Sequence, residues 1–320
     1  MQWYPVELHT HTCHSDGDFN IKEIVHTAKR AGYQALAVTD HNTASGTEEF
    51  FHEAEKQGIL PVYGLEWTTY YGHMVVLGEQ GYTDWRGVKP EEIDDAIRSI
   101  HQNGGIVGIA HPFSLSDPIN TGYLWEFQIH DWTLPDYIEV WSRNYAPRRI
   151  QSERAFALWD ELLGKGIHIT AMTGRDWHRD DQLPCCYTWA GISGELTAET
   201  LLEAVRSGRI CLSAGPLLTL KAHQKENELF PGGTAEEGKI KLEIILKEDV
   251  FSDSREKDQI TAEEIRIFAN GQETVRIPVQ EQTVLELQAE KGWMRAELYG
   301  TYYGTKHCRI AVTNPIYINE

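Results

Sequence analysis

Apolar and amphipathic segments alternate along the chain from residue 1 to about residue 214. Four successive segments show the pattern: PVELHTH (5–11), IKEIVHTAKRAG (21–32), ALAVTDH (35–41) and GTEEFFHEAEKQG (46–58). Short apolar runs are typical of buried strands, whereas apolar residues spaced three and four apart are typical of helices. Strands that alternate with helices predict a largely parallel sheet in an α/β fold.

The same alternation continues to residue 178 and completes the predicted architecture of this half. The further segments are ILPVYGLEW (59–67), HMVVLG (73–78), PEEIDDAIRSIHQNGG (90–105), IVGIAHP (106–112), YIEVWS (137–142), RRIQSERAFALWDELLGKG (148–166) and HITAMTGRDWH (168–178). Roughly seven strands with helices between them predict a closed or distorted barrel over residues 1–214. The segment 116–136 interrupts the alternation, and we weigh two interpretations of it: a lid or wall, and a surface insertion.

The hydrophobic pattern changes to a period of two after residue 214. Examples are KIKLEIIL (239–246), TVLELQA (283–289) and RIAVTNPIYI (309–318). Short strands of this kind, with a hairpin turn at Asn270-Gly271, predict a small β-sandwich domain over residues 215–320. Because its strand ends lack a cluster of His, Asp and Glu, we expect an accessory or oligomerising module outside the chemistry. A homo-oligomer therefore stays open.

Composition and charge argue against nucleic-acid and membrane partners. A chain of 320 residues with 41% hydrophobic residues can bury a sizeable core, and its length fits two domains. The formal charge of −19, from 29 Lys and Arg against 48 Asp and Glu, would repel a phosphate backbone, so we expect no nucleic-acid partner. No apolar run approaches the roughly 20 residues that span a bilayer, and we expect no membrane partner.

Two features of the sequence predict a cytoplasmic protein. The N-terminal stretch MQWYPVELHT has no basic region followed by an apolar one, as a secretory signal peptide would have. The cysteines are odd in number and show no C-x-x-C spacing, which argues against a disulfide framework and a thiolate zinc site. They are Cys13, Cys185, Cys186, Cys211 and Cys308. Reduced thiols fit the cytoplasm.

The first candidate chemistry lies in the stretch ELHTHTCHSDG (7–17). Residues two apart in a strand project to the same side, so His9 and His11 can direct their rings to one point. Such a point suits a metal ion. An isolated His-x-His pair is nevertheless more often a hydrogen-bonded pair than a ligand set, so the rest of the chain has to decide.

Metal-ligand residue types close nearly every apolar run of the first half. They are His9, His11, His41, Glu66, His73, His111, Asp176 and His178. The carboxyl ends of parallel barrel strands meet on one face, so these residues are expected to converge. Their number exceeds the four ligands that one zinc ion commonly takes, which predicts a cluster of two or three ions. Glu66 has two oxygens and can bridge neighbouring ions. Mixed His and carboxylate ligands favour Zn²⁺, Mn²⁺ or Fe²⁺.

Several separated motifs together resemble one known family. They are HTHTCHSDG (9–17), VTDHNTASG (38–46), GLEWTT (64–69), GHMVVLG (72–78), AHPFS (110–114), EVWSRN (139–144) and GRDWHRDD (174–181). This series resembles the PHP (polymerase and histidinol phosphatase) superfamily of metal-dependent phosphoesterases. The later stretch SGRICLSAGP (207–216) and the β-rich tail are similar to its CehA/McbA-type members.

The resemblance implies a distorted (β/α)7 barrel that binds up to three metal ions. It implies that His9, His11, Glu66 and Asp176 hold the first ion. Glu66, His73 and His111 would hold the second ion, and Asp16, His41 and His178 would hold the third. Arg175 stands where many relatives carry a small residue, but strand parity turns it away from Asp176, so we expect no contact with substrate.

A metal cluster of this kind predicts hydrolysis without a protein nucleophile. Two close cations lower the pKa of a bridging water towards neutrality, and the resulting metal-bridging hydroxide attacks an ester that the ions polarise. A small anionic phosphorylated substrate fits best, because its phosphate oxygens match the cations. We assign catalytic roles to Glu66, Asp176 and Arg143. Glu139 should face the barrel mouth, and Trp141 and Arg143 share its parity, which makes Arg143 the candidate phosphate clamp.

Two other functions stay open at this point. The same hydroxide would hydrolyse a carboxyl or carbamate ester, for which Trp67, Trp141 and Trp177 would supply an aromatic pocket. From a different class, the protein would be a metal-stabilised binding module without catalysis. Asp40 is a candidate for orienting a ligand from behind.

Overall fold

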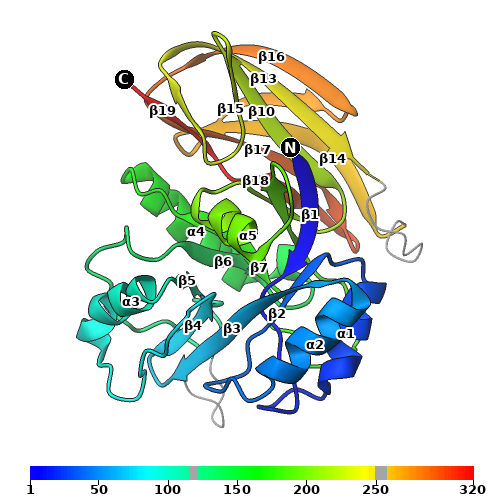
Figure 1. The fold of residues 1–320 in the computed structure, drawn as a ribbon. Coiled ribbons are helices and arrows are strands. Elements are labelled where there is room, and N and C mark those ends of the chain that lie inside the picture. The colour runs from blue at the N-terminus through cyan, green and yellow to red at the C-terminus, as the bar shows by residue number, and fades with distance from the viewer. Residues whose placement is uncertain (116–121, 249–257) are drawn as a thin grey trace.

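The computed structural model describes residues 1–115, 122–248 and 258–320. Its first half contains seven strands that are neighbours in chain order within one sheet (Figure 1). They are β1 (Gln2–Glu7), β2 (Ala35–Val38), β3 (Leu60–Thr69), β4 (Gly72–Leu77), β5 (Ile106–Ile109), β6 (Tyr137–Ser142) and β7 (Thr170–Gly174). The mixed α/β class is confirmed.

The two ends of this series of strands meet just beyond β1 and β7. Thr10 and Trp177 form a parallel bridge. The backbone N–H of His11 donates to the carbonyl of Trp177 at 2.9 Å, and that of Trp177 donates to the carbonyl of His9 at 3.2 Å. The residues that follow β1 and β7 are thereby held side by side.

The regular alternation of strand and helix breaks at β3 and β4. These strands are antiparallel, with Glu66 paired to Val75 and Thr69 to Gly72, and β4 is also antiparallel to β5. A tight hairpin replaces a helical connection there. The structure shows that β1 to β7 are neighbours in chain order. A complete (β/α)7 barrel stays a prediction.

Five α-helices are described. They are α1 (Ile21–Arg30), α2 (Thr47–Gln57), α3 (Ile93–Gln102), α4 (Ile150–Gly164) and α5 (Ala198–Arg206), with short 3₁₀ turns η1 (Pro90–Glu92) and η2 (Ala146–Arg148). In α1, a capping box of Asn20 and Glu23 satisfies free backbone N–H groups. Buried Ile24 and Ala28, one turn apart, fix its inner face.

Two further strands extend the sheet beyond β1. They are β8 (Tyr187–Ile192), which is antiparallel to β1, and β9 (Ile210–Ser213), which is antiparallel to β8. The other edge of β9 pairs with β18 (Thr305–Thr313), with Ser213 opposite Ala311. The sheet therefore continues from the first half into the region after residue 214.

The region after residue 214 consists of strands in two sheets. The four-stranded sheet contains β11 (Asn227–Leu229), β10 (Leu217–Gln224), β13 (Gly238–Lys247) and β16 (Gln282–Ala289). The large sheet receives β12 (Thr234–Glu236), β14 (Ile260–Ala269), β15 (Gln272–Pro278), β17 (Gly292–Tyr302), β18 and β19 (Ile316–Asn319). Leu242 of one sheet and Ile267 and Leu298 of the other are fully buried in one hydrophobic cluster. The division of the chain at residue 214 stays a prediction.

Within the described ranges, we find no helix whose length and apolar character would let it cross a membrane.

Candidate metal centre

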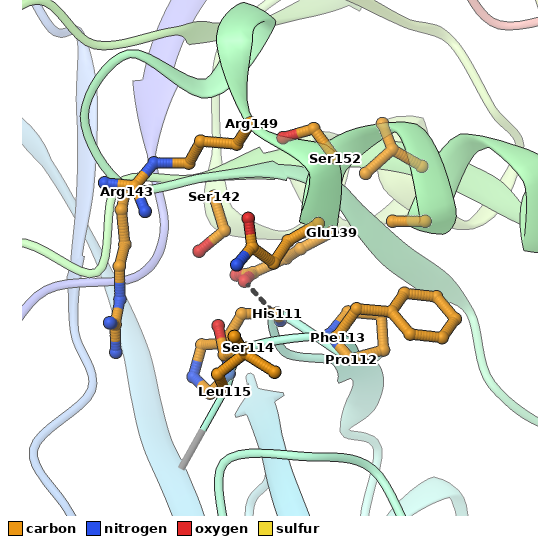
Figure 2. Close-up of a pocket in the computed structure, with 13 residues that line it drawn as sticks. His111, Pro112, Phe113, Ser114, Leu115, Glu139, Ser142, Arg143, Arg149 and Ser152 are labelled. Carbon is orange, nitrogen blue, oxygen red and sulfur yellow. Dashed lines mark hydrogen bonds between the residues drawn. The ribbon is translucent and has the colours of Figure 1, made fainter. Parts of the chain in front are cut away.

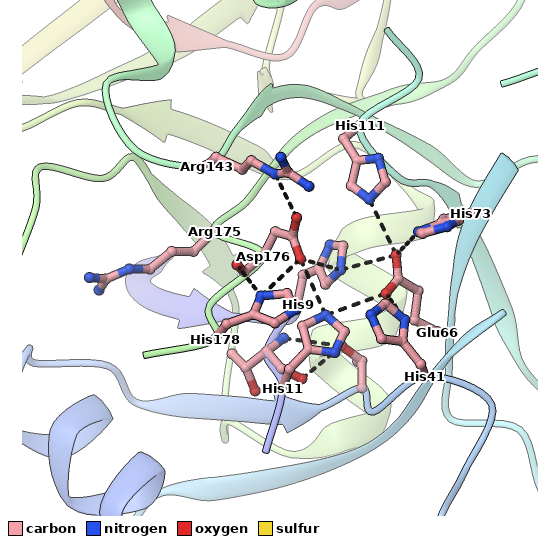
Figure 3. A network of polar contacts seen from close by, with 12 residues as sticks. His9, His11, His41, Glu66, His73, His111, Arg143, Arg175, Asp176 and His178 are labelled. Atoms are coloured by element: carbon pink, nitrogen blue, oxygen red, sulfur yellow. Dashed lines mark hydrogen bonds and ion pairs between the residues drawn. The ribbon is translucent and has the colours of Figure 1, made fainter. Parts of the chain in front are cut away.

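The nine residues with predicted ligand roles lie together in one cluster. Figure 3 labels all of them except Asp16. The donor atoms of each of four groups lie within 4.8 Å of one another. The groups are His11, Asp16, His41 and His178; His9, His111 and Asp176; His9, His11 and Glu66; and His41, Glu66 and His73. Strand order explains the convergence, because the donors lie in or directly after neighbouring strands and the loop after β1.

Glu66 occupies the middle of this cluster and is fully buried. Its Oε1 lies 3.1 Å from Nδ1 of His73 and 3.3 Å from Nε2 of His9 and of His111. Its Oε2 lies 2.8 Å from Nδ1 of His41 and 3.3 Å from Nε2 of His11. Burial alone would raise the pKa of Glu66, but the surrounding histidines lower that pKa well below its usual range. Glu66 is therefore ionised, and its two oxygens face different histidine rings.

Asp176 is the second buried carboxylate, and its backbone is held in an unusual conformation. Its Oδ1 lies 3.3 Å from Nε2 of His11 and 3.4 Å from Nδ1 of His178, and its Oδ2 accepts a 2.8 Å hydrogen bond from Nε of Arg143. Asp176, His111 and Arg143 have φ angles of 51°, 29° and 64°. Positive φ in residues other than glycine costs about 1–3 kcal/mol and clusters at functional sites.

Asp16 differs from the other two carboxylates because its side chain is 55% exposed. Its Oδ1 lies 3.2 Å from Nε2 of His178 and 3.4 Å from Nε2 of His41. Partial burial would raise the pKa of Asp16, yet these two imidazoles lower it below its usual value. The donors around Asp16 therefore form the solvent side of the cluster.

The state of the buried nitrogens shows whether these residues fit metal ions. Nε2 of His9, both ring nitrogens of His11 and Nε2 of His73 are buried and have no hydrogen-bond partner among the described residues. A buried polar atom without a partner costs free energy unless a ligand satisfies it. Six histidines and three carboxylates, several with unpartnered atoms directed into one cluster, fit divalent cations such as Zn²⁺, Mn²⁺ or Fe²⁺.

Glu139 supports this cluster from behind, a role that the sequence interpretation did not assign. Its Oε1 lies 2.7 Å from Nδ1 of His9, and its Oε2 accepts a 3.0 Å hydrogen bond from the backbone N–H of His111. A Cβ at Gly174 would meet Oε1 of Glu139 at 1.9 Å, so glycine makes the room for this carboxylate. Carboxylates in this position orient metal-binding histidines. An acidic residue inside the apolar run YIEVWS was the available signal.

Asp40 holds the loop that carries Asp16. Its two oxygens accept hydrogen bonds from the backbone N–H and the hydroxyl of Thr12, each at 2.7 Å, and one also accepts from Ser15 at 2.6 Å. Asp40 therefore fixes the turn between His11 and Asp16. Its predicted role in orienting a ligand from behind stays a prediction.

A cavity of about 140 Å³ adjoins the cluster (Figure 2). His111, Glu139, Arg143 and Arg149 contribute to its lining. Arg143 thus lines a cavity that His111 of the cluster also lines.

Tyr123 adds an aromatic face beside the cluster. Its ring centroid lies 5.2 Å from that of His73, and the guanidinium carbon of Arg143 lies 5.2 Å from the same Tyr123 ring. Tyr123 belongs to the interrupting segment 116–136, of which residues 116–121 lie outside the described residues. The described part of that segment therefore supplies a wall at the site.

The three tryptophans proposed for an aromatic pocket lie in the core, so that expectation is wrong. Trp67, Trp141 and Trp177 are at most 2% exposed. A register shift between Glu139 and Trp141 breaks the shared parity, and Trp141 packs against Phe156 of α4 with ring centroids 5.6 Å apart. Trp177 lies under Arg175, whose guanidinium carbon is 3.7 Å from a Trp177 ring centroid.

Comparisons with known proteins agree with this geometry. Residues 7–113 match the PHP domain family. A PolC-type DNA polymerase III from Staphylococcus epidermidis is 48% identical over 63 residues, which are 19% of this chain and 4% of that polymerase. An error-prone DNA polymerase from Symbiobacterium thermophilum is 37% identical over 84 residues, which are 25% of this chain and 8% of that polymerase. This chain therefore spans only a small part of the length of these polymerases.

One solved structure is similar over nearly the whole chain. It is a two-domain protein from Bacteroides vulgatus described as containing a predicted PHP-like metal-dependent phosphoesterase, and it has a TM-score of 0.56 at 15% identity. The similarity covers 98% of this chain and 95% of that one, which shows a shared fold. The donors from His9 to His111 lie within the match of residues 7–113 to the PHP domain family, and this match supports the PHP superfamily for the chain.

Proposed function

We propose that this protein is a metal-dependent hydrolase that cleaves phosphate esters of a small anionic molecule. The PHP domain supports a hydrolase, and the observation that carries the proposal is the convergence of nine donors with buried, unpartnered nitrogens. When bound, two or three divalent ions would activate a water molecule and polarise the ester. Zn²⁺, Mn²⁺ and Fe²⁺ all fit the donor set.

The roles of the chain's own residues follow from their positions. Glu66 faces His9, His73 and His111 with one oxygen and His11 and His41 with the other, which suits a carboxylate shared by two ions. Asp176 contributes to the same set and is held by Arg143 through a 2.8 Å hydrogen bond.

Arg143 supplies the cation for the phosphate group. It lines the cavity next to His111. Burial alone would lower the pKa of Arg143, but the Asp176 carboxylate raises it above its usual value. Its planar donors match two phosphate oxygens. The alternative, a carboxyl or carbamate ester hydrolase, loses support because Trp67, Trp141 and Trp177 are buried.

Two finer assignments complete the proposal. Within the superfamily we assign the chain to the CehA/McbA type, supported by SGRICLSAGP (207–216) and the strand-rich region after it. We also assign residues 1–214 to the metallohydrolase part and residues 215–320 to an accessory part, supported by the clustering of all nine donors before residue 179.

The proposal is tested by metal analysis and hydrolysis together. Purified protein supplemented with Zn²⁺, Mn²⁺ or Fe²⁺ should contain at least two ions per chain by elemental analysis. It should hydrolyse p-nitrophenyl phosphate, lose that activity to a chelator and regain it with metal. Less than about one ion per chain would overturn the cluster. Bound metal without hydrolysis of phosphate or carboxyl esters would instead indicate a binding module.

A further inference from the structure

The cavity beside His111 contains two arginines in different electrostatic situations (Figure 2). Arg143 donates to the Asp176 carboxylate, so its charge is compensated within the protein. Arg149 donates from Nε to the backbone carbonyl of Asn144 at 2.7 Å. Among the described residues, no carboxylate lies within ion-pair distance of Arg149. Its two terminal nitrogens are left for another acceptor.

The two guanidinium groups also act on each other. Burial lowers the pKa of Arg149, and the positive charge of Arg143 lowers it further. Two like charges beside one cavity repel each other, and an anion between or beside them removes that repulsion. The chain as a whole carries a formal charge of −19. The positive charge of Arg149 beside this cavity is therefore opposite in sign to the net charge of the protein.

The remaining lining of this cavity offers further hydrogen-bond donors. Ser114, Gln151 and Ser152 line it, and so does Ser142, whose buried hydroxyl has no partner among the described residues. Helix α4 begins at the cavity, and its N-cap Arg149 makes no side-chain capping bond. The first turn of a helix favours a negative charge, which adds to the charge of the arginine.

The loop that carries both arginines is fixed on its outer side. The backbone N–H of Tyr145 donates to the carbonyl of Pro184 at 3.0 Å. The Tyr145 ring also meets the ring of Tyr303 edge to face, with centroids 5.3 Å apart. Tyr303 belongs to the turn between β17 and β18, so the region after residue 214 helps to position Arg143 and Arg149. A site held in place before binding loses less entropy when it binds.

We infer that Arg149, together with the first turn of α4, binds a second anionic group of the substrate, a carboxylate or a second phosphate. The inference rests on the proposed function, in which Arg143 and the metal cluster take the phosphate that is cleaved. The substrate class is then a phosphate ester whose other end carries a negative charge close enough to share one cavity of about 140 Å³ with Arg143.

A matched pair of substrates tests this assignment. Glycerol 3-phosphate and 3-phosphoglycerate differ in a hydroxymethyl group against a carboxylate. The metal-loaded wild type should have the higher kcat/KM for 3-phosphoglycerate. Arg149→Ala should lower the ratio of the two kcat/KM values about ten-fold, as expected for a charge-assisted hydrogen bond. Arg148→Ala removes a neighbouring exposed arginine and should leave the ratio unchanged. An equal ratio in the wild type and Arg149→Ala would overturn the inference.

A binding measurement separates this inference from the proposed function. Inorganic phosphate is titrated by calorimetry into chelator-treated wild type, Arg149→Ala and Arg148→Ala, with folding checked by circular dichroism. Loss of about ten-fold in affinity for Arg149→Ala alone supports the anion site even if no ester is hydrolysed. Equal affinity in all three proteins would overturn the site even if the enzyme is an active phosphatase.

Discussion

Glu139 places one carboxylate oxygen 2.7 Å from Nδ1 of His9. If Nε2 of His9 is the metal-binding nitrogen, Nδ1 carries the proton and donates it to Glu139. The other oxygen of Glu139 accepts from the backbone N–H of His111 at 3.0 Å. One buried side chain therefore fixes the ring of one predicted metal ligand and the main chain of another.

Glu139→Gln is expected to weaken metal binding without unfolding the protein. A glutamine has one acceptor oxygen, so His9 and His111 would compete for it. Loss of such a supporting carboxylate typically lowers metal affinity about 10- to 100-fold. Competition with a chelator measures the change. Glu161→Gln, at an exposed position of α4, is the control. Unchanged affinity in Glu139→Gln would show that Glu139 acts only in folding.

Glu66→Gln is expected to disturb two ions together. The two oxygens of Glu66 face different histidines, so the amide would remove charge from both sides of the cluster. Elemental analysis should show the loss of more than one ion per chain relative to the wild type. Loss of a single ion would remove the bridging role from Glu66.

Arg143→Ala is expected to lower kcat/KM for p-nitrophenyl phosphate about ten-fold or more, in line with about 1.5–3 kcal/mol for a charge-assisted hydrogen bond. Hydrolysis of neutral p-nitrophenyl acetate, if measurable, should change little. Because Arg143 also holds Asp176, metal content must be measured in parallel. Equal losses on both esters would assign Arg143 to the support of Asp176 alone.

Much of the donor cluster was predictable because most of its donors close apolar runs. His73 is an exception, because it lies at the start of β4, which is antiparallel to β3. A histidine such as His41 at the end of ALAVTDH is visible in the sequence, and neighbouring strands then bring such ends together. All nine predicted donors lie in the cluster. Their roles as metal ligands stay predictions.

The parts that were missed depend on contacts between distant segments. The register shift at Glu139 and Trp141 turns Trp141 into the core, which an alternating pattern alone cannot show. The pairing of β8 with β1 and of β9 with β18 is likewise long-range. The role that we propose for Arg149 has no signal in the sequence, because it depends on the lack of a nearby carboxylate among the described residues.

Glu297→Gln is expected to destabilise the protein at neutral pH. The carboxylate of Glu297 is fully buried and accepts hydrogen bonds from Arg295 and Arg309, each at 2.7 Å. Removing one partner of a buried ion pair typically costs about 3–5 kcal/mol of unfolding free energy. Chemical denaturation at pH 7 measures this cost. Glu286→Gln at an exposed position of β16 should have little effect.

The stability difference between the wild type and Glu297→Gln is expected to depend on pH. Burial would raise the pKa of Glu297, but Arg309 and Arg295 lower it from the usual 4.5 to about 2. The lowered pKa stabilises the folded state above pH 4.5, and this contribution is lost as the pH falls towards 2. The stability difference between wild type and Glu297→Gln should therefore shrink over that range. A constant difference would contradict the prediction.

A fragment of residues 1–214 is expected to associate through β9. In the full chain, β18 pairs with this strand, and its removal exposes a row of backbone donors and acceptors. Size-exclusion chromatography should show oligomers or aggregates that the full chain does not form. A monomeric, metal-loaded and active fragment would show that residues 215–320 are dispensable for both solubility and chemistry.

Asn314 links the end of the chain to the strand that precedes the last two predicted donors, so the order of synthesis affects when the donor cluster is complete. Its buried side chain bonds to both backbone groups of Ala171 in β7, at 2.8 and 2.9 Å, across 143 positions of sequence. Asp176 and His178 follow that strand directly. Contacts of such long range form late, because the intervening chain must first be available. In ribosome-bound chains shorter than 314 residues, the donors before Asp176 should therefore be in place earlier than Asp176 and His178. Full metal loading should follow release of the chain.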